Sequence, residues 1–140
     1  MIKAVIDTNV FLSAIFWEGT PAQVIKLALS KKIIGVTSKQ ILQELEEKLL
    51  KKFGFPEDQT AAYLTLIIEN FSMVEPAHKV SIVKEDPDDN KIIEAAIEAK
   101  ADCIVTGDKH LLKIAIYSGI EIVKPHNLLK KTLFYSYGHK

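Results

Sequence analysis

The chain has 140 residues, the length of one ordinary domain, and 48% of them are hydrophobic, which indicates a compact core and excludes a disordered chain. Its 18 acidic residues are balanced by 18 basic ones, so no overall positive charge indicates a nucleic-acid partner. All the basic residues are lysines, whose point charges cannot make the bidentate phosphate contacts of arginine. We predict one domain over residues 1–140.

The sequence also predicts a cytoplasmic protein without membrane association. No apolar run approaches the roughly 18 residues of a membrane span, and the start does not resemble a secretory signal. Cys103 is the single cysteine, so it cannot form an internal disulfide, and we expect a reduced core residue.

The first predicted element is a strand over residues 2–6, whose apolar, β-branched run is typical of a strand buried on both faces of a parallel sheet. It ends at Asp7. Ligands of open parallel sheets bind outside the carboxyl ends of the strands, which makes Asp7 a candidate metal ligand. Asp7 could equally cap the following helix, and this stretch does not decide between the two.

The elements that follow alternate between helices and strands. In the first half they are a helix over 10–16, a helix opened by a capping box at Thr20-Pro21-Ala22-Gln23, a strand over 33–37 and a helix from the N-cap Ser38 to near Gly54. A helix over 57–71, with Ala61, Leu64, Ile67 and Ile68 on its apolar face, and a strand over 72–74 follow. In the second half they are a helix from Asp86 to about Lys100, a strand over 103–106, a helix over 110–117 ending at Gly119, a strand over 120–123 and a helix from His126. Residues 80–83 remain ambiguous. This alternation predicts a three-layer α/β/α sandwich with a central parallel sheet.

Acidic residues recur at the predicted carboxyl edge of that sheet. Asp7 and Asp108 directly follow strands, Asp89 opens a helix, and Glu44 precedes the apolar Leu45. Four carboxylates gathered there would repel one another unless a cation neutralised them, and an all-oxygen cluster suits Mg²⁺ or Mn²⁺. We expect metal-assisted phosphodiester hydrolysis with one or two ions.

Each residue of this predicted site has an expected role. Asp7 would be the main ligand, Glu44 and Asp89 would complete the ligand set directly or through water, and Asp108 would hold a second ion or its waters. Four polar residues would hydrogen-bond these ligands: Thr8, Asn9, Ser38 and Thr106.

Every acid also has a purely structural explanation. Asp86 could be an N-cap with Asp89 at the third helical position, Asp108 a turn residue and Glu44 a surface acid. For Asp88 and Asp89 the structural and functional interpretations carry equal weight.

Four segments resemble motifs of the PIN-domain family, and most closely its prokaryotic toxin-like members, which are similar to VapC-type ribonucleases. They are V-I-D-T-N-V-F-L-S-A, I-L-Q-E-L around Glu44, D-P-D-D-N-K-I-I-E-A-A and I-V-T-G-D-K-H-L-L. The resemblance covers residues 1–129. It implies a metal-dependent ribonuclease whose acids map onto Asp7, Glu44, Asp89 and Asp108, with Asp88 as an alternative to Asp89. It also implies an RNA substrate, a homodimer and a small antitoxin partner.

Three other functions compete with this interpretation. A PIN-like module could bind RNA or a protein without cutting. A haloacid-dehalogenase-like phosphatase would use Asp7 as nucleophile, but Asn9 stands where its second acid belongs. A response-regulator receiver fails because it lacks a phosphoacceptor aspartate after the third strand.

The tail over residues 126–140 has two interpretations. Lys130, Lys131, Phe134, Tyr135, Tyr137 and Lys140 could contact RNA by charge and stacking. The favoured alternative is an amphipathic element packed on the sheet or at a dimer interface.

Overall fold

The computed structural model describes the backbone of residues 1–138 and the side chains as far as residue 133. Its strands form one sheet in the order β3-β2-β1-β4-β6-β5. They are β1 (Lys3–Ile6), β2 (Ile34–Ser38), β3 (Ser72–Val74), β4 (Cys103–Val105), β5 (Ile116–Tyr117) and β6 (Ile120–Val123). All neighbours are parallel except β5 and β6, which confirms the predicted parallel sheet and adds an antiparallel edge strand.

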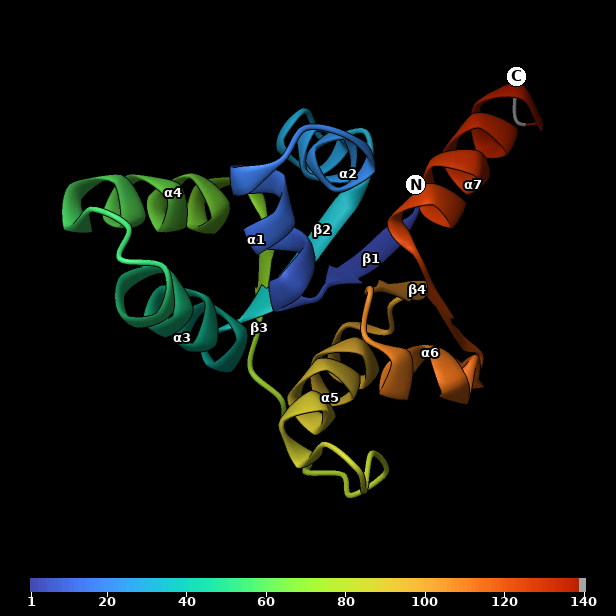
Figure 1. Cartoon of the computed structure of the whole chain (residues 1–140). Helices are drawn as coiled ribbons and strands as arrows, with labels where there is room; N and C mark the ends of the chain where they lie inside the picture. The colour runs from blue at the N-terminus through green and yellow to red at the C-terminus, as the bar shows by residue number, and fades with distance from the viewer. Residues whose placement is uncertain (139–140) are drawn as a thin grey trace.

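Helices cover both faces of this sheet, as the three-layer prediction requires. They are α1 (Thr8–Phe16), α2 (Thr20–Leu29), α3 (Lys39–Glu47), α4 (Glu57–Asn70), α5 (Asn90–Ala99), α6 (Lys109–Ile114) and α7 (Pro125–Gly138). In Figure 1, α2 and α7 lie on one side of the sheet and α5 and α6 on the other. Over the described residues, none of these helices has both the length and the apolar character needed to cross a membrane.

The central strand is β1, which pairs with β2 on one side and β4 on the other. Its residues Ala4, Val5 and Ile6 are fully inaccessible to solvent, as expected of a strand covered on both faces. Cys103 in β4 is also buried and carries a free thiol, as predicted. Because β1 and β4 run in parallel, their carboxyl ends meet at one edge, where Asp7 and Thr106 follow them.

A loop over residues 75–86 connects β3 to α5 and is held by polar side chains of that helix. The backbone N–H groups of Ile82 and Val83 donate to Asn90 Oδ1 over 3.0 and 2.8 Å. The Val80 N–H donates to a Glu94 carboxylate oxygen over 2.8 Å. The ambiguous segment 80–83 is therefore a loop anchored to α5, and it leads directly to the 3₁₀ turn Pro87–Asp89 that precedes this helix.

Two details of the helices predicted in the first half of the chain are wrong, one in α2 and one in α4. Thr20 does not cap α2, because Gly19 occupies the N-cap position and no side chain bonds to the first turn. In α4 the buried residues are Thr60 and Ile67, whereas Ile68 is 51% exposed. The helix is therefore rotated relative to the predicted apolar face.

The predicted helix over 110–117 is also too long. It ends at Ile114, and Ile116 and Tyr117 form β5 instead. Gly119 has a φ of +80° and Ser118 a φ of +48°, so these two residues make the tight turn into β6. Positive φ at both central residues is the geometry that a two-residue hairpin loop requires, which explains the glycine.

The C-terminal helix α7 begins at Pro125, close to the predicted start, and packs against α2. Leu128 is fully buried in the core, in agreement with the packing interpretation of this segment. The side chains of residues 134–140 lie outside the described part of the structure. The predicted RNA contacts of Phe134, Tyr135, Tyr137 and Lys140 fall in this segment.

Candidate metal site

Asp7 lies at the carboxyl end of the central strand and is 4% exposed. Its Oδ1 accepts a 2.7 Å hydrogen bond from the backbone N–H of Thr8, so it caps α1. Its Oδ2 accepts a 2.7 Å bond from the Thr106 hydroxyl. The sequence left capping and site interpretations of Asp7 open, and the structure shows that the residue caps the helix and is influenced by the charges of Glu44 and Asp108.

Thr106 connects Asp7 to the next acid along the edge. Its hydroxyl oxygen also accepts a 2.9 Å hydrogen bond from the backbone N–H of Asp108. Asp108 in turn caps α6, because its Oδ1 accepts from the N–H groups of His110 and Leu111 over 2.7 and 3.3 Å. One buried hydroxyl therefore fixes the relative positions of two carboxylates that are distant in sequence.

Three carboxylates converge at this edge: Asp86, Asp89 and Asp108 offer one oxygen each, all within 4.8 Å of one another. Asp89 is 8% exposed, and its Oδ2 is buried without a hydrogen-bond partner among the described residues. A buried carboxylate oxygen without a donor is unfavourable unless a proton or a cation satisfies it. The cluster thus fits a divalent cation.

Burial and neighbouring negative charges raise the pKa values of Asp89 and Asp7. Burial raises the pKa of Asp89 to about 8, and the negative charges of Asp108, Asp7 and Asp86 contribute. Burial likewise raises the pKa of Asp7, against the hydrogen bonds from Thr106 and Thr8, and Glu44 and Asp108 add to the increase. Asp89 is therefore influenced by the charges of Asp7, Asp86 and Asp108, and Asp7 by those of Glu44 and Asp108.

Glu44, on α3, differs because it has its own cation. Its Oε2 accepts a 3.0 Å hydrogen bond from Lys91 Nζ, and Lys48 lies 3.9 Å away. Burial would raise the pKa of Glu44, but the nearby Thr8 hydroxyl, Lys91 and Lys48 together lower it. Glu44 is therefore held as a carboxylate beside the other acids.

The remaining predicted residues have varied surroundings. Asn9 Oδ1 accepts a weak 3.4 Å bond from the Gly107 N–H. Ser38 caps α3 by accepting from the Ile41 N–H over 3.3 Å and bonds to none of the acids. The Thr8 hydroxyl is buried without a partner at bonding distance in the described part of the chain. Asp88 is exposed and outside the three-carboxylate group.

Sequence reasoning did not assign Asp86 to the site. Its position depends on the loop before α5, which the Asn90 side chain holds in place, and Asn90 Nδ2 also donates to the Pro87 carbonyl over 3.0 Å. The only signal in the sequence was the dense D-P-D-D-N segment, in which Asp86 also had an explanation as a helix cap.

Comparison with known proteins now identifies the family. A family profile described as PIN domain matches residues 3–110. The chain belongs to the PIN-domain family. An uncharacterized protein of Methanocaldococcus jannaschii is 37% identical to this PIN domain over 118 residues, which are 81% of this chain and 75% of that protein.

Two solved structures have a similar fold. One is a crystal structure of VapBC2 from Rickettsia felis bound to a DNA fragment from the VapBC2 promoter. It matches with a TM-score of 0.61 and 17% identity, over 86% of this chain and 97% of that one. The T. brucei RRP44 PIN domain matches with a TM-score of 0.59 and 13% identity, over 98% of this chain and 84% of that one. Both confirm the PIN fold, which excludes the receiver and dehalogenase-like interpretations.

Proposed function

We propose that this PIN domain is a divalent-metal-dependent endoribonuclease, with Asp7, Glu44, Asp89 and Asp108 as its active-site acids together with Asp86. The observation that carries the proposal is the convergence of the Asp86, Asp89 and Asp108 carboxylates, together with the buried Asp89 Oδ2 that has no hydrogen-bond partner among the described residues. A group of carboxylate oxygens without histidine suits Mg²⁺ or Mn²⁺, as predicted from the sequence. Membership of the PIN family, whose members are typically metal-dependent nucleases, supports the same conclusion.

The residues would divide the work by position. Asp86, Asp89 and Asp108 would hold the ion, and Asp7, oriented by Thr106, lies beside them. Lys91 keeps Glu44 ionised, so Glu44 adds a fixed negative charge next to Asp7. When bound, one or two divalent ions would supply Lewis-acid chemistry, which makes a water more acidic and offsets the charge developing on the phosphate.

The proposal is tested by cleavage of a structured RNA pool in Mn²⁺ or Mg²⁺. Wild type should cut, EDTA should stop the cutting, and Asp7→Asn and Asp89→Asn should abolish it. Asp88→Asn is the matched control, because it removes the same charge from an exposed position one residue away. It should retain wild-type activity.

Two outcomes would contradict the nuclease. Cutting that persists in both Asp7→Asn and Asp89→Asn would indicate a contaminating enzyme. Absence of both cutting and calorimetric Mn²⁺ binding would favour the non-catalytic PIN-like module instead. Mn²⁺ binding lost in Asp89→Asn but kept in Asp88→Asn would support the ligand assignment independently of the RNA used.

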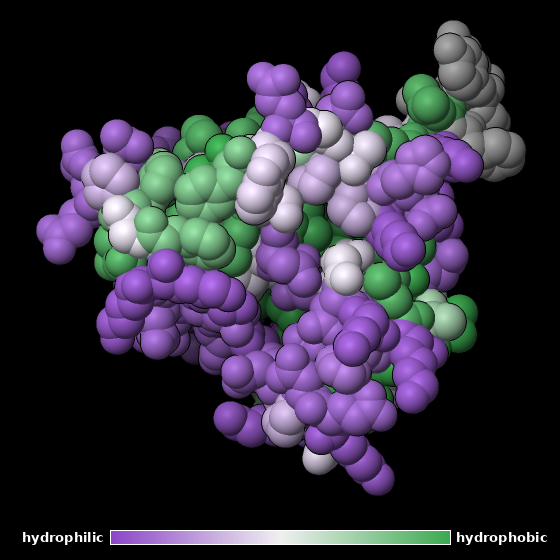
Figure 2. Space-filling model, viewed as in Figure 1, coloured by the Kyte–Doolittle hydropathy of each residue, from purple (hydrophilic) through white to green (hydrophobic). Residues whose placement is uncertain are grey.

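We further infer that the chain is the toxin of a toxin–antitoxin pair, acting in the cytoplasm with a small antitoxin as partner. Support comes from the structural likeness to VapBC2 and from exposed apolar surface. Trp17 is 65% and Phe53 42% exposed, and Figure 2 shows hydrophobic residues gathered over α4 and the neighbouring end of α1. Induced expression in a prokaryotic host should arrest growth, and Asp89→Asn should not. Equal growth of both strains would contradict the toxin role.

A further inference from the structure

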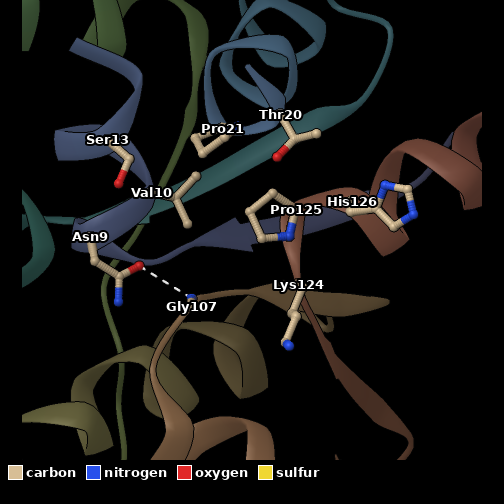
Figure 3. Close-up of a pocket in the computed structure, with 9 residues that line it drawn as sticks. All are labelled: Asn9, Val10, Ser13, Thr20, Pro21, Gly107, Lys124, Pro125 and His126. Atoms are coloured by element: carbon tan, nitrogen blue, oxygen red, sulfur yellow. Dashed lines mark hydrogen bonds between the residues drawn. The ribbon is translucent and has the colours of Figure 1, made fainter. Parts of the chain in front are cut away.

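A cavity of about 450 Å³ lies beside the acidic cluster, between the first turns of α1, α2 and α7. Figure 3 shows Asn9 on one side of it, Lys124 and His126 on the other, and Thr20 and Pro125 between them. Two lining residues connect the cavity to the acids along the chain. Asn9 follows Asp7 by two residues, Gly107 lies between Thr106 and Asp108, and the Asn9–Gly107 hydrogen bond forms a wall of the cavity.

The lining combines apolar faces with hydrogen-bonding groups, as ligand pockets do. Val10, Pro21 and Pro125 supply flat apolar walls. The hydroxyls of Ser13 and Thr20 can donate or accept. Asn9 Oδ1 is used by Gly107, which leaves its Nδ2 as a donor toward a ligand. A nucleobase has the same character, with apolar faces and polar edges.

The lysine of this cavity has no carboxylate partner in the described part of the chain. Lys124 forms no ion pair there, in contrast to Lys91, Lys113 and Lys131. A second cavity is lined by Glu44, Glu47 and Asp88 together with three lysines. Lys48 and Lys51 there are paired with Glu44 and Glu47, whereas Lys52 has no ion pair in the described part of the chain. The cavity on the α7 side differs because no carboxylate of the described residues lines it, so Lys124 can offer its charge to a phosphate.

We propose that the cavity binds one nucleotide of single-stranded RNA next to the phosphate that is cut. This inference rests on the proposed nuclease function. Lys124 contacts the phosphate on the far side of that nucleotide, and Asn9, Ser13 and Thr20 hydrogen-bond its base and sugar. The RNA strand then enters the acidic cluster past the Asn9–Gly107 wall, so the cavity positions the substrate and contributes to base preference.

The test is binding of a fluorescein-labelled single-stranded RNA, measured by anisotropy in Ca²⁺ over a range of salt concentrations, with the RNA checked on gels for intact length. Lys124→Ala should weaken binding about fivefold and reduce the slope of log Kd against log salt by about 0.7, the value for one lost phosphate contact on a single strand. Thr20→Val should weaken binding by a similar factor without changing the slope, because it removes a hydrogen bond and no charge.

Lys26→Ala is the matched control, since Lys26 is exposed on the same helix as Thr20 but near its other end. It should bind as wild type does. Equal slopes for wild type and Lys124→Ala, equal losses in Lys26→Ala, or no binding by wild type would each overturn the subsite. Cleavage of RNA by wild type in Mn²⁺ is measured in parallel. If wild type cuts but Lys124→Ala binds RNA equally well, only the subsite proposal fails. If binding depends on Lys124 but wild type does not cut, only the proposed nuclease activity fails.

Discussion

Two buried threonines at the carboxyl edge of the sheet have opposite hydrogen-bonding states. The Thr106 hydroxyl donates to Asp7 and accepts from the Asp108 N–H. The hydroxyl of Thr37, the penultimate residue of β2, is buried and has no partner among the described residues. Thr106→Val should lower the free energy of unfolding by about 1–3 kcal/mol, because it leaves a buried carboxylate oxygen and an N–H unsatisfied. Urea unfolding measures the loss.

The matched variant Thr37→Val makes the same change of shape where no hydrogen bond is lost. It should leave the free energy of unfolding unchanged or raise it, since a buried unpartnered hydroxyl is unfavourable. Equal destabilisation by the two variants would show that the Thr106 bridge has no special importance.

Asp89 should make the metal-free protein sensitive to pH. Its pKa is about 8 in the folded state but about 3.9 in an unfolded chain, so the folded state holds a proton that the unfolded state has released. Stability therefore falls as pH rises from about 4 to about 8. Asp89→Asn removes this dependence and should melt higher than wild type at pH 8 in EDTA, but at the same temperature near pH 4.

Thermal unfolding followed by circular dichroism at the two pH values provides the measurement. Asp88→Asn should behave as wild type at both, because its side chain is exposed. A wild-type melting temperature that does not fall between pH 4 and pH 8 relative to Asp89→Asn would contradict the raised pKa.

At the scale of elements, close packing of β2 depends on Gly35. A Cβ atom at this position would lie 2.5 Å from Cε2 of the Phe71 ring, well inside van der Waals contact, and Phe71 is itself buried at the end of α4. Gly35→Ala should destabilise the fold by about 1–3 kcal/mol through overpacking. Urea unfolding of the single variant measures this loss.

Two further variants separate crowding from other effects. Gly107→Ala adds a Cβ with nothing within 4 Å and should have little effect on stability. Combining Gly35→Ala with Phe71→Leu should destabilise less than the sum of the single changes, because the smaller side chain makes room. Strict additivity would argue against a clash with the ring.

The elements that sequence patterns predicted are those defined by local periodicity. Residues 2–6 are apolar throughout, and Ser38 caps α3 within three residues of its own position, so both could be recognised. β5 could not, since Ile116 and Tyr117 continue a helical pattern and Gly119 suits either a helix end or a hairpin turn. The orientation of α4 could not be predicted from the sequence either, because contacts with other elements determine which of its faces is buried.

The site divides in the same way. Asp7 and Asp108 directly follow apolar strands, and parallel strands end at one edge, so their proximity followed from topology. The pairing of Glu44 with Lys91 spans 47 residues, and Asp86 is placed by a loop bonded to Asn90. Neither contact has a local sequence pattern. The catalytic roles and the single domain over residues 1–140 stay predictions.

At the scale of the whole molecule, a bound ion should stabilise the fold. Asp86 and Asp89 lie before α5, and Asp108 lies beyond β4, so one ion would join two separate segments. Mn²⁺ at about 100 times its Kd should add about 2.7 kcal/mol to the free energy of unfolding. Wild type and Asp88→Asn should both melt higher with Mn²⁺ than with EDTA, and Asp89→Asn should show no shift. An equal shift in all three would place the ion elsewhere.

Both edges of the sheet are short. β3 has three residues and β5 has two, so each presents few free backbone groups to another chain. Long, flat edge strands promote aggregation and strand exchange between copies, and short ones protect against it. Short edges therefore disfavour intermolecular β-pairing, and a homodimer, which the family resemblance implies, would be expected to assemble through its helices.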